Sequence, residues 1–255
     1  MPKNEFNFQG ANIQGDAGQI DKRGSQDNRQ PAEITSKTAQ GMKDRAEELE
    51  QQSSRKADEN HAPKVNEWYL FISGFLQHKG KPNGITQLWH DVRHQQSGPR
   101  TVVETEVWNM DAGKYAEIVW RFIDRDNSRI VITGYSWGGY TALKLCRALK
   151  DRGIIVDELI LVDAVFRFPL WIGRFTAFMP FIPIKVPSNV AKITWFTQKQ
   201  NLPRGHKVKT AATNTELEPE QILEVNHQYI DDHPKVRESV LEIIGNEGTS
   251  KDETG

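Results

Sequence analysis

Residues 129–149 read RIVITGYSWGGYTALKLCRAL and divide into an expected strand, a turn and a helix. Residues 130–133 are a short β-branched apolar run, which is typical of a strand buried on both faces. Residues 142, 143, 145, 146 and 149 are apolar at helical spacing. The turn between these elements has the pattern Gly-x-Ser-x-Gly, formed by Gly134, Ser136 and Gly138.

This spacing has a steric reason. A serine at a very tight turn from strand to helix takes a strained backbone conformation, and its side chain projects from the carboxyl end of the strand. The residues two before and two after it then press against each other and the neighbouring strand, so glycine fits at 134 and 138. The helix that follows points free N–H groups at the serine. We predict a nucleophilic Ser136 and an oxyanion-binding Trp137 N–H, with a glycine-rich turn as the alternative interpretation.

The composition indicates that only part of the chain folds compactly. Hydrophobic residues are 37% of the 255 residues, and the mean hydropathy is −0.64. Residues 1–62 are polar and almost free of aromatic side chains, so we expect a disordered or partly helical N-terminal segment there. Apolar residues 39, 42, 46 and 49 form a weak helical seam, which indicates a fraying helix or a docking helix for a protein partner. We expect a folded domain over residues 63–246 and a flexible tail over 247–255.

Charge and local motifs argue against several classes of function. Lys plus Arg (33) nearly balances Asp plus Glu (34), so no overall basic bias favours nucleic-acid binding. His90 and His94 are four residues apart on an expected helix but lack the glutamate of a His-Glu-x-x-His zinc motif, and we expect neither metal nor cofactor. The single cysteine, Cys146, is expected to pack in the core. Without an apolar signal core or a run of about 18 apolar residues, we expect no membrane span and a soluble, cytoplasmic protein.

Strands and helices are expected to alternate through the middle of the chain. This pattern predicts an α/β fold with a mostly parallel sheet and helices on both faces. Binding sites in such sheets lie at the carboxyl ends of the strands, where Gly74, Ser136 and Asp163 are expected. The expected strands are 67–73, 101–108, 130–133, 158–162 and 193–196, and the expected helices besides the one after Ser136 are 85–96, 111–124 and 235–244.

A serine hydroxyl needs a base to accept its proton, and the base is normally a histidine oriented by a carboxylate. Asp163 is the preferred carboxylate because it ends the strand after the Ser136 helix and should share its edge of the sheet. Asp157 lies at the opposite end of that strand. Asp231 and Asp232 remain rivals.

Three histidines follow Ser136 and could serve as the base. His227 lies in a loop before the last helix, which fits the order serine, acid, histidine, and it is the preferred candidate. His206 lies in a polar loop and could be only a surface residue. His233 precedes a proline that begins a helix, so it could belong to the helix cap.

The motifs and their order resemble the α/β-hydrolase superfamily, on its lipase- and esterase-like side. The resemblance implies that Ser136 is the nucleophile, His227 the general base and acid, and Asp163 its orienting partner. It also implies that the backbone N–H groups of Trp137 and Phe75 form the oxyanion hole. Two features depart from the family pattern: Ser73-Gly74 replaces the usual His-Gly, and the acid comes one strand after the nucleophile. The matching pieces are Gly74-Phe75, residues 134–139, residues 161–165, and His227 with Ile230-Asp231 and Pro234.

The stretch 166–187 is rich in aromatic and aliphatic residues and directly follows Asp163. We expect Phe166, Trp171 and Phe175 to form an apolar wall that binds the acyl group of a substrate, with ordinary core packing as the alternative. The predicted function is hydrolysis of small-molecule or lipid carboxylic esters through an acyl-enzyme. The alternatives are a non-catalytic scaffold of the same fold, or a thioesterase, acyltransferase or peptidase that uses the same triad.

Overall fold

The computed structural model describes residues 64–77, 81–166, 179–210 and 212–245. The expected N-terminal segment (1–62), the expected tail (247–255) and residues 167–178 lie outside the described residues. The main sheet has the strand order β2-β1-β3-β4-β6-β8, with β9 also pairing with β6, and every pairing in it is parallel. Its strands are β1 (Glu67–Ser73), β2 (Thr101–Val107), β3 (Arg129–Tyr135), β4 (Val156–Val162), β6 (Val190–Gln198), β8 (Glu216–Leu217) and β9 (Gln221–Leu223).

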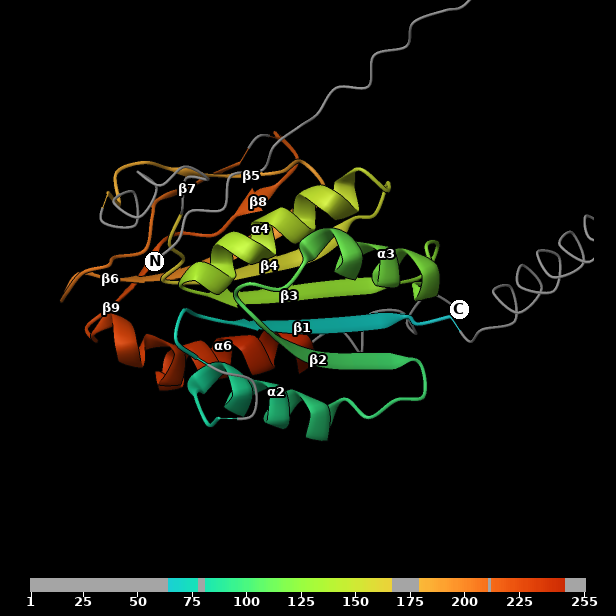
Figure 1. Ribbon diagram of the computed structural model, residues 1–255, viewed down its shortest axis with the longest axis horizontal. Helices are drawn as coiled ribbons and strands as arrows, with labels where there is room; N and C mark the ends of the chain where they lie inside the picture. Colours follow the sequence, from blue (N-terminus) through green and yellow to red (C-terminus); the bar gives the residue numbers. More distant parts are fainter. Residues whose placement is uncertain (1–63, 78–80, 167–178, 211, 246–255) are drawn as a thin grey trace, which may run out of the picture. The chain divides into compact units, whose positions relative to one another are not determined.

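Helices cover both faces of this sheet. Helices α3 and α4 lie over one face, and α2 and α6 lie over the other (Figure 1). Each face therefore carries its own apolar core, and β1 is buried at six consecutive positions from Trp68 to Ser73. The helices are α2 (Gly84–Gln95), α3 (Ala112–Phe122), α4 (Trp137–Lys150) and α6 (Pro234–Gly245), with a 3₁₀ helix η1 (His227–Asp232) before α6.

The helix starts follow the local sequence. Asp111 caps α3 by accepting hydrogen bonds from two backbone N–H groups of its first turn, and Pro234 is the first residue of α6. In α4 the five apolar positions expected to face the core are all buried, including Cys146. The predicted type and order of the elements from β1 to β4 are therefore confirmed.

The last third of the sheet differs from the expectation. Strand β6 spans Val190–Gln198 and is longer than the expected strand 193–196. Strands β8 and β9 were not predicted, nor was a separate parallel pair, β5 (Ile184–Val186) with β7 (Val208–Thr210). These four strands have two or three residues each, which is too short for a period-2 pattern to stand out.

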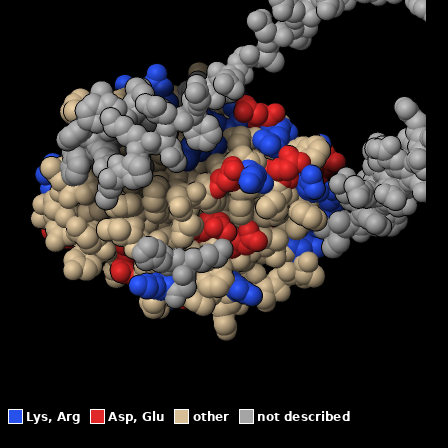
Figure 2. Space-filling model, viewed as in Figure 1, with Lys and Arg blue, Asp and Glu red and all other residues tan. Residues whose placement is uncertain are grey.

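The strand that leads to Ser136 lies inside the sheet, between β1 and β4. A parallel sheet with helices on both faces and a sharp turn from this strand into α4 is the α/β-hydrolase architecture, so the predicted fold class is confirmed. None of the helices within the described ranges is long and apolar enough to cross a membrane. Figure 2 shows one face of the molecule, where Lys and Arg lie beside Asp and Glu rather than in a field of one sign.

Candidate active site

Ser136 occupies the turn between β3 and α4, and its backbone is strained. Its φ is 53° and its ψ is −121°, and a positive φ is uncommon for a residue other than glycine. The turn is held by hydrogen bonds on both sides: the Ser136 N–H donates to the Val162 carbonyl, and the Val165 N–H donates to the Ser136 carbonyl. Because its side chain makes no capping bond to α4, the hydroxyl is left for another partner.

The two glycines of the motif are needed because of close backbone approaches. A Cβ at Gly134 would lie 2.8 Å from the carbonyl oxygen of Gly138. A Cβ at Gly138 would collide with the carbonyl oxygens of Ile72 and Ser73 in β1. This is the crowding that the Gly-x-Ser-x-Gly spacing predicts, so the steric interpretation of the motif is confirmed.

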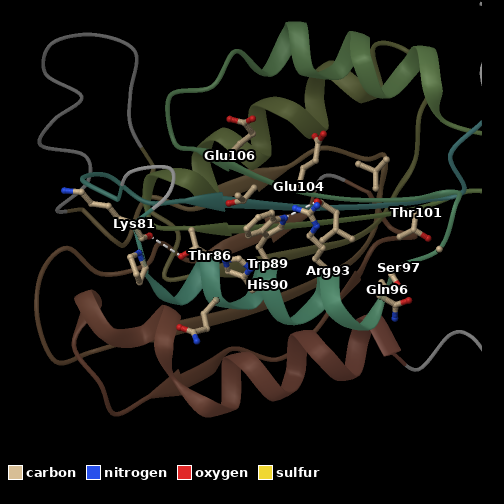
Figure 3. A pocket seen from close by; sticks show the side chains of 16 residues that line it. Lys81, Thr86, Trp89, His90, Arg93, Gln96, Ser97, Thr101, Glu104 and Glu106 are labelled. Carbon is tan, nitrogen blue, oxygen red and sulfur yellow. Dashed lines mark hydrogen bonds between the residues drawn. The ribbon is translucent and has the colours of Figure 1, made fainter.

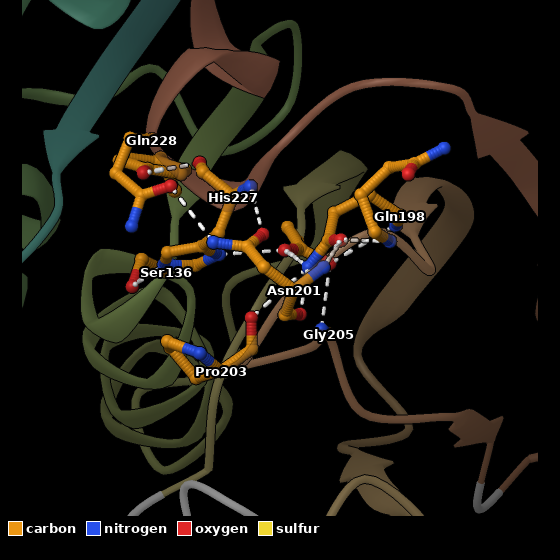
Figure 4. A network of polar contacts seen from close by, with 10 residues as sticks. Ser136, Gln198, Asn201, Pro203, Gly205, His227 and Gln228 are labelled. Carbon is orange, nitrogen blue, oxygen red and sulfur yellow. Dashed lines mark hydrogen bonds and ion pairs between the residues drawn. The ribbon is translucent and has the colours of Figure 1, made fainter.

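Three of the predicted site residues form one hydrogen-bonded line, of which Figure 4 labels Ser136 and His227. The Ser136 Oγ lies 2.9 Å from His227 Nε2, and His227 Nδ1 lies 2.6 Å from Asp163 Oδ2. All three side chains are buried, with exposed fractions of 5% for Ser136, 7% for His227 and 0% for Asp163. A carboxylate only accepts hydrogen bonds, so the imidazole carries its proton on Nδ1 and its Nε2 accepts from the serine hydroxyl.

Asp163 is buried but receives hydrogen bonds at both oxygens. Oδ1 accepts from the backbone N–H of Gly205 over 2.6 Å and from that of Gln198 over 3.3 Å. Oδ2 accepts from the Gln198 side-chain amide over 3.0 Å as well as from His227. Donors of this kind compensate a buried carboxylate for its removal from water.

Gln198, the last residue of β6, also organises the loop beyond it. Its Nε2 donates to the carbonyl oxygens of Asn201 and Pro203, at 2.9 Å and 3.0 Å (Figure 4). Its Oε1 accepts from the backbone N–H groups of Gln200 and Asn201, at 2.7 Å and 3.0 Å. A single amide therefore fixes both the acid and the loop beside it. Gln198 could not be predicted as a site residue, because a glutamine at a strand end has no distinguishing pattern in the sequence.

Two further residues hold the backbone of His227. The Asn201 side chain accepts from the His227 N–H over 2.7 Å, and the Tyr135 hydroxyl donates to the His227 carbonyl oxygen over 2.7 Å. Burial, followed by the nearby Asp231 carboxylate, raises the pKa of Tyr135 far above its ordinary value, so its hydroxyl stays a donor. Both residues were missed, although Tyr135 lies inside the motif that led to Ser136.

The rival histidines occupy other environments. His206 is only 1% exposed, so the expectation of a surface residue is wrong: its loop returns to pair beside β5, and its Nδ1 lies 2.8 Å from the Ile182 carbonyl oxygen. His233 does belong to a helix cap, because its Nδ1 accepts from the Lys235 N–H in the first turn of α6 over 3.2 Å. Among the histidines that the structure describes, His227 is therefore the one hydrogen-bonded to the side chains of Ser136 and Asp163.

The rival carboxylates have other hydrogen-bond partners or face solvent. Asp157 accepts from the Ile130 N–H over 2.7 Å at the start of β3, which is the opposite end of that strand from Ser136. Asp231 is buried in η1 and accepts from the side chain of Gln77 over 2.7 Å. Asp232 is exposed.

One of the two predicted oxyanion donors follows Ser136 in the chain, and the other lies in the turn after β1, close to Ser136. Trp137 is the first residue of α4, next to Ser136. Phe75 belongs to the turn after β1, whose Gly74 is so close that an added Cβ would lie 3.1 Å from the Ser136 Cβ. Among the described residues, the Phe75 N–H donates no hydrogen bond, which leaves it open to a substrate oxygen.

Aromatic side chains surround these donors. The rings of Phe75, Trp108 and Trp137 lie in mutual contact. The centroid distance is 4.4 Å for Phe75–Trp137, 5.2 Å for Trp108–Trp137 and 5.4 Å for Phe75–Trp108. Phe75 is 47% exposed. We call these three residues the aromatic cluster. Of the expected acyl-binding wall, Phe166 packs against Tyr140 and His206, while Trp171 and Phe175 lie outside the described residues.

A pocket of about 910 Å³ lies elsewhere, between α2 and the edge strand β2 (Figure 3). Its lining includes Trp89, whose indole N–H donates to the Val103 carbonyl oxygen over 3.0 Å and so covers part of the open strand edge. Neither Ser136 nor His227 lines it. The described residues hold no group of three or more His, Cys, Asp or Glu suited to a metal ion.

The chain is distantly similar to several thioesterases of known structure. No protein-family model matches the chain, and no curated protein matches it in sequence. The Vlm2 thioesterase domain bound with a dodecadepsipeptide is 15% identical, with 71% of this chain and 94% of that chain covered and a TM-score of 0.37. YbtT, a type II thioesterase from the Yersiniabactin NRPS/PKS biosynthetic pathway, is 10% identical, with 71% and 92% covered and a TM-score of 0.37. The NocB thioesterase domain is 13% identical, with 71% and 95% covered and a TM-score of 0.38.

At these scores the likeness decides neither substrate nor reaction. The fold assignment rests on the strand order, the parallel pairings and the helix placement of this chain.

Proposed function

We propose that this chain is a serine hydrolase that cleaves carboxylic esters through an acyl-enzyme. One observation carries the proposal: a strained, buried serine, an imidazole and a carboxylate are joined by hydrogen bonds of 2.9 Å and 2.6 Å at the carboxyl edge of a parallel sheet. The nucleophile–base and base–acid contacts of a serine hydrolase have this form.

The reaction begins with a proton transfer. His227 Nε2 takes the hydroxyl proton as Ser136 Oγ attacks the carbonyl carbon of the ester, and the carbonyl oxygen becomes an oxyanion. The N–H groups of Trp137 and Phe75 stabilise this oxyanion, aided by the positive end of the α4 dipole. The imidazolium then gives its proton to the leaving alcohol, and the acyl group stays on Ser136. Water, deprotonated by the same imidazole, then attacks the acyl carbon. The bond from this carbon to Ser136 Oγ breaks, the imidazolium returns its proton to Oγ, and the acid leaves.

Asp163 orients and stabilises the imidazole throughout. Its 2.6 Å hydrogen bond keeps the Nδ1 proton in place, and its charge stabilises the imidazolium that forms after proton transfer. The four hydrogen bonds that Asp163 accepts hold it fixed while the proton moves between serine, imidazole and leaving group.

The aromatic cluster supports an ester with an apolar acyl group. The exposed Phe75 ring and the half-buried rings of Trp108 and Trp137 offer a surface beside the nucleophile. An aliphatic or aromatic acyl chain that covers this surface gains from the hydrophobic effect. A thioester or amide would react by the same steps, because the imidazole protonates any of these leaving groups. The relative kcat/KM for matched oxygen esters, thioesters and amides of one acyl group therefore decides the class.

The test uses a fluorophosphonate probe and a series of p-nitrophenyl esters. We expect the probe to label Ser136 and the protein to hydrolyse the esters, and we expect Ser136→Ala to abolish labelling. His227→Ala should lower kcat by about 10⁴–10⁶-fold. His206→Ala is the matched control, since it also removes a buried histidine. A folded protein that neither reacts with the probe nor hydrolyses esters or thioesters would refute the proposal, and loss of activity in His206→Ala alone would refute the assignment of the base.

A further inference from the structure

The turn that carries Phe75 has an unfavourable residue at its third position. Residues Gly74–Gln77 form this turn, which is closed by a 3.2 Å hydrogen bond from the Gln77 N–H to the Gly74 carbonyl. Leu76, the third residue, has a φ of 67°. Turns with a positive φ at this position favour glycine, and a leucine there is strained. Leu76 is also 71% exposed, so its own packing contributes little to holding the turn.

The side chain of Gln77 supplies bonds that hold this turn. Its Oε1 accepts from the Gly74 N–H over 2.9 Å, and its Nε2 donates to Asp231 Oδ2 over 2.7 Å. The amide oxygen therefore accepts from the turn Gly74–Gln77, which we call the oxyanion turn. The amide nitrogen donates to a second element, η1. Asp231 is 2% exposed and lies in η1, the same short helix that begins with His227.

Asp231 is itself fixed from the other side. It packs against the start of α2 so closely that a Cβ at Gly84 would collide with the Asp231 carbonyl group. The element that carries the base, the start of α2 and the oxyanion turn therefore meet at Asp231 and Gln77. Gln77 and Asp231 are separated by 154 positions in the sequence.

We propose that Gln77 and Asp231 are positioning residues that hold the Phe75 N–H toward the oxyanion formed on Ser136, an inference that rests on the proposed function. Neither side chain touches the reacting atoms. Without the bridge, Leu76 is free to leave its left-handed conformation, and the peptide that carries the Phe75 N–H then rotates. The nucleophile and the base stay in place, but one of the two oxyanion donors is lost.

The first test removes the bridge and separates rate from binding. Loss of one oxyanion donor costs about 10²–10³-fold in kcat, and a donor that is released rather than deleted should cost about 10–100-fold. We expect Gln77→Ala and Asp231→Ala each to lower kcat in this range with KM within about twofold, since the donor acts mainly in the transition state. The double alanine variant should be no worse than either single one. Gln87→Ala, an exposed glutamine on α2, is the matched control and should match the unchanged protein.

The second test exchanges donor and acceptor. Asp231→Asn keeps an acceptor for Gln77 and should retain activity within about threefold, since a neutral oxygen accepts a weaker bond. Gln77→Glu sets two carboxyl groups against each other and should lose activity like Gln77→Ala. In the double variant Gln77→Glu/Asp231→Asn, the carboxylate introduced at position 77 accepts from both the Gly74 N–H and the new amide at position 231. Its kcat should therefore return to within about fivefold of the unchanged protein.

The outcomes separate the inference from the function on which it rests. An unchanged kcat in folded Gln77→Ala, or a double exchange variant that folds and regains nothing, would overturn the positioning role while the hydrolase assignment stands. A fall in kcat that only accompanies a lower melting temperature, with no recovery of kcat in the exchange variant, would point to a structural role. That result would also overturn the positioning role. An unchanged protein inert to the probe and to every ester would instead remove the proposed function, and this inference with it.

Discussion

The hydroxyl of Tyr135 donates a 2.7 Å hydrogen bond to the backbone carbonyl oxygen of His227. Tyr135 directly precedes the nucleophile, so the same turn that presents Ser136 also holds the backbone of the base. The two rings also lie near each other, with a centroid distance of 5.3 Å. Tyr135 therefore helps to fix the distance between the Ser136 hydroxyl and the His227 imidazole. This distance sets how readily the proton passes between them.

Tyr135→Phe should weaken this relationship without emptying the site. The ring stays, but the His227 carbonyl loses a buried donor, which costs about 1–3 kcal/mol of stability. We expect kcat to fall by about 3–30-fold with little change in KM, since a small misplacement of the base affects the transition state most. Steady-state kinetics and urea unfolding measure the two effects. Tyr140→Phe, in α4, is the matched control, and equal kinetics for the two variants would contradict the role given to Tyr135.

Gln198→Ala should damage the acid rather than the nucleophile. The substitution deletes the amide that donates to Asp163 and to two loop carbonyls, and it leaves two loop N–H groups without their acceptor. We expect kcat to fall by about 10–100-fold, as for other groups that support a reacting side chain, together with a lower melting temperature.

The control for this substitution is Gln200→Ala, an exposed glutamine two residues further along the chain. Fluorophosphonate labelling of Ser136 should be slowed in Gln198→Ala and unaffected in Gln200→Ala. If both variants react at the rate of the unchanged protein, Gln198 does not support the acid.

The site residues that belong to a local motif could be predicted from the sequence better than those that act through contacts between distant segments. The Gly-x-Ser-x-Gly turn could be predicted because its chemistry is contained in five neighbouring residues, and Asp163 followed from parallel strands ending at one edge. The structure brings these two residues and His227 into one hydrogen-bonded line, while their catalytic roles stay proposals.

The supporting side chains could not be predicted in the same way. Gln198, Asn201 and Gln77 act through contacts between distant segments, and no local period or motif marks them. The hydrophilic residues around His206 predict a surface loop, whereas His206 is buried. Its burial depends on the short β5–β7 pair, which is too brief to leave a pattern in the sequence.

Trp108→Ala should change which esters are preferred rather than whether esters are cleaved. The indole lies against the rings of Phe75 and Trp137 and is not part of the hydrogen-bonded line of Ser136, His227 and Asp163. We expect kcat/KM for benzoyl or hexanoyl esters to fall by about tenfold, which is the size of a lost aromatic contact. Acetyl esters, which are too short to cover the cluster, should change by less than about twofold. Trp120→Ala, in α3 with its ring against Arg125, is the control, and a uniform loss over all acyl lengths would contradict the prediction.

Asp231 should make stability depend on pH in a direction that can be worked out. Burial, with a smaller contribution from the neighbouring Asp232 charge, raises the pKa of Asp231 to about 6, although the Gln77 hydrogen bond opposes the change. A carboxyl group whose pKa is higher in the folded state stabilises the fold fully below its unfolded pKa, near 4. That stability is lost as the pH rises through about 6.

Asp231→Asn removes this titration and keeps the acceptor for Gln77. Because a shift of about 2 pKa units corresponds to about 3 kcal/mol, the variant should gain up to that much unfolding free energy relative to the unchanged protein between pH 4 and pH 8. Urea unfolding at a series of pH values measures the difference in unfolding free energy between the two proteins. Other carboxyl groups with a raised pKa, such as Glu158, contribute equally to both proteins and cancel in this difference. A difference that stays constant over this range would mean that Asp231 does not titrate as a buried carboxyl group.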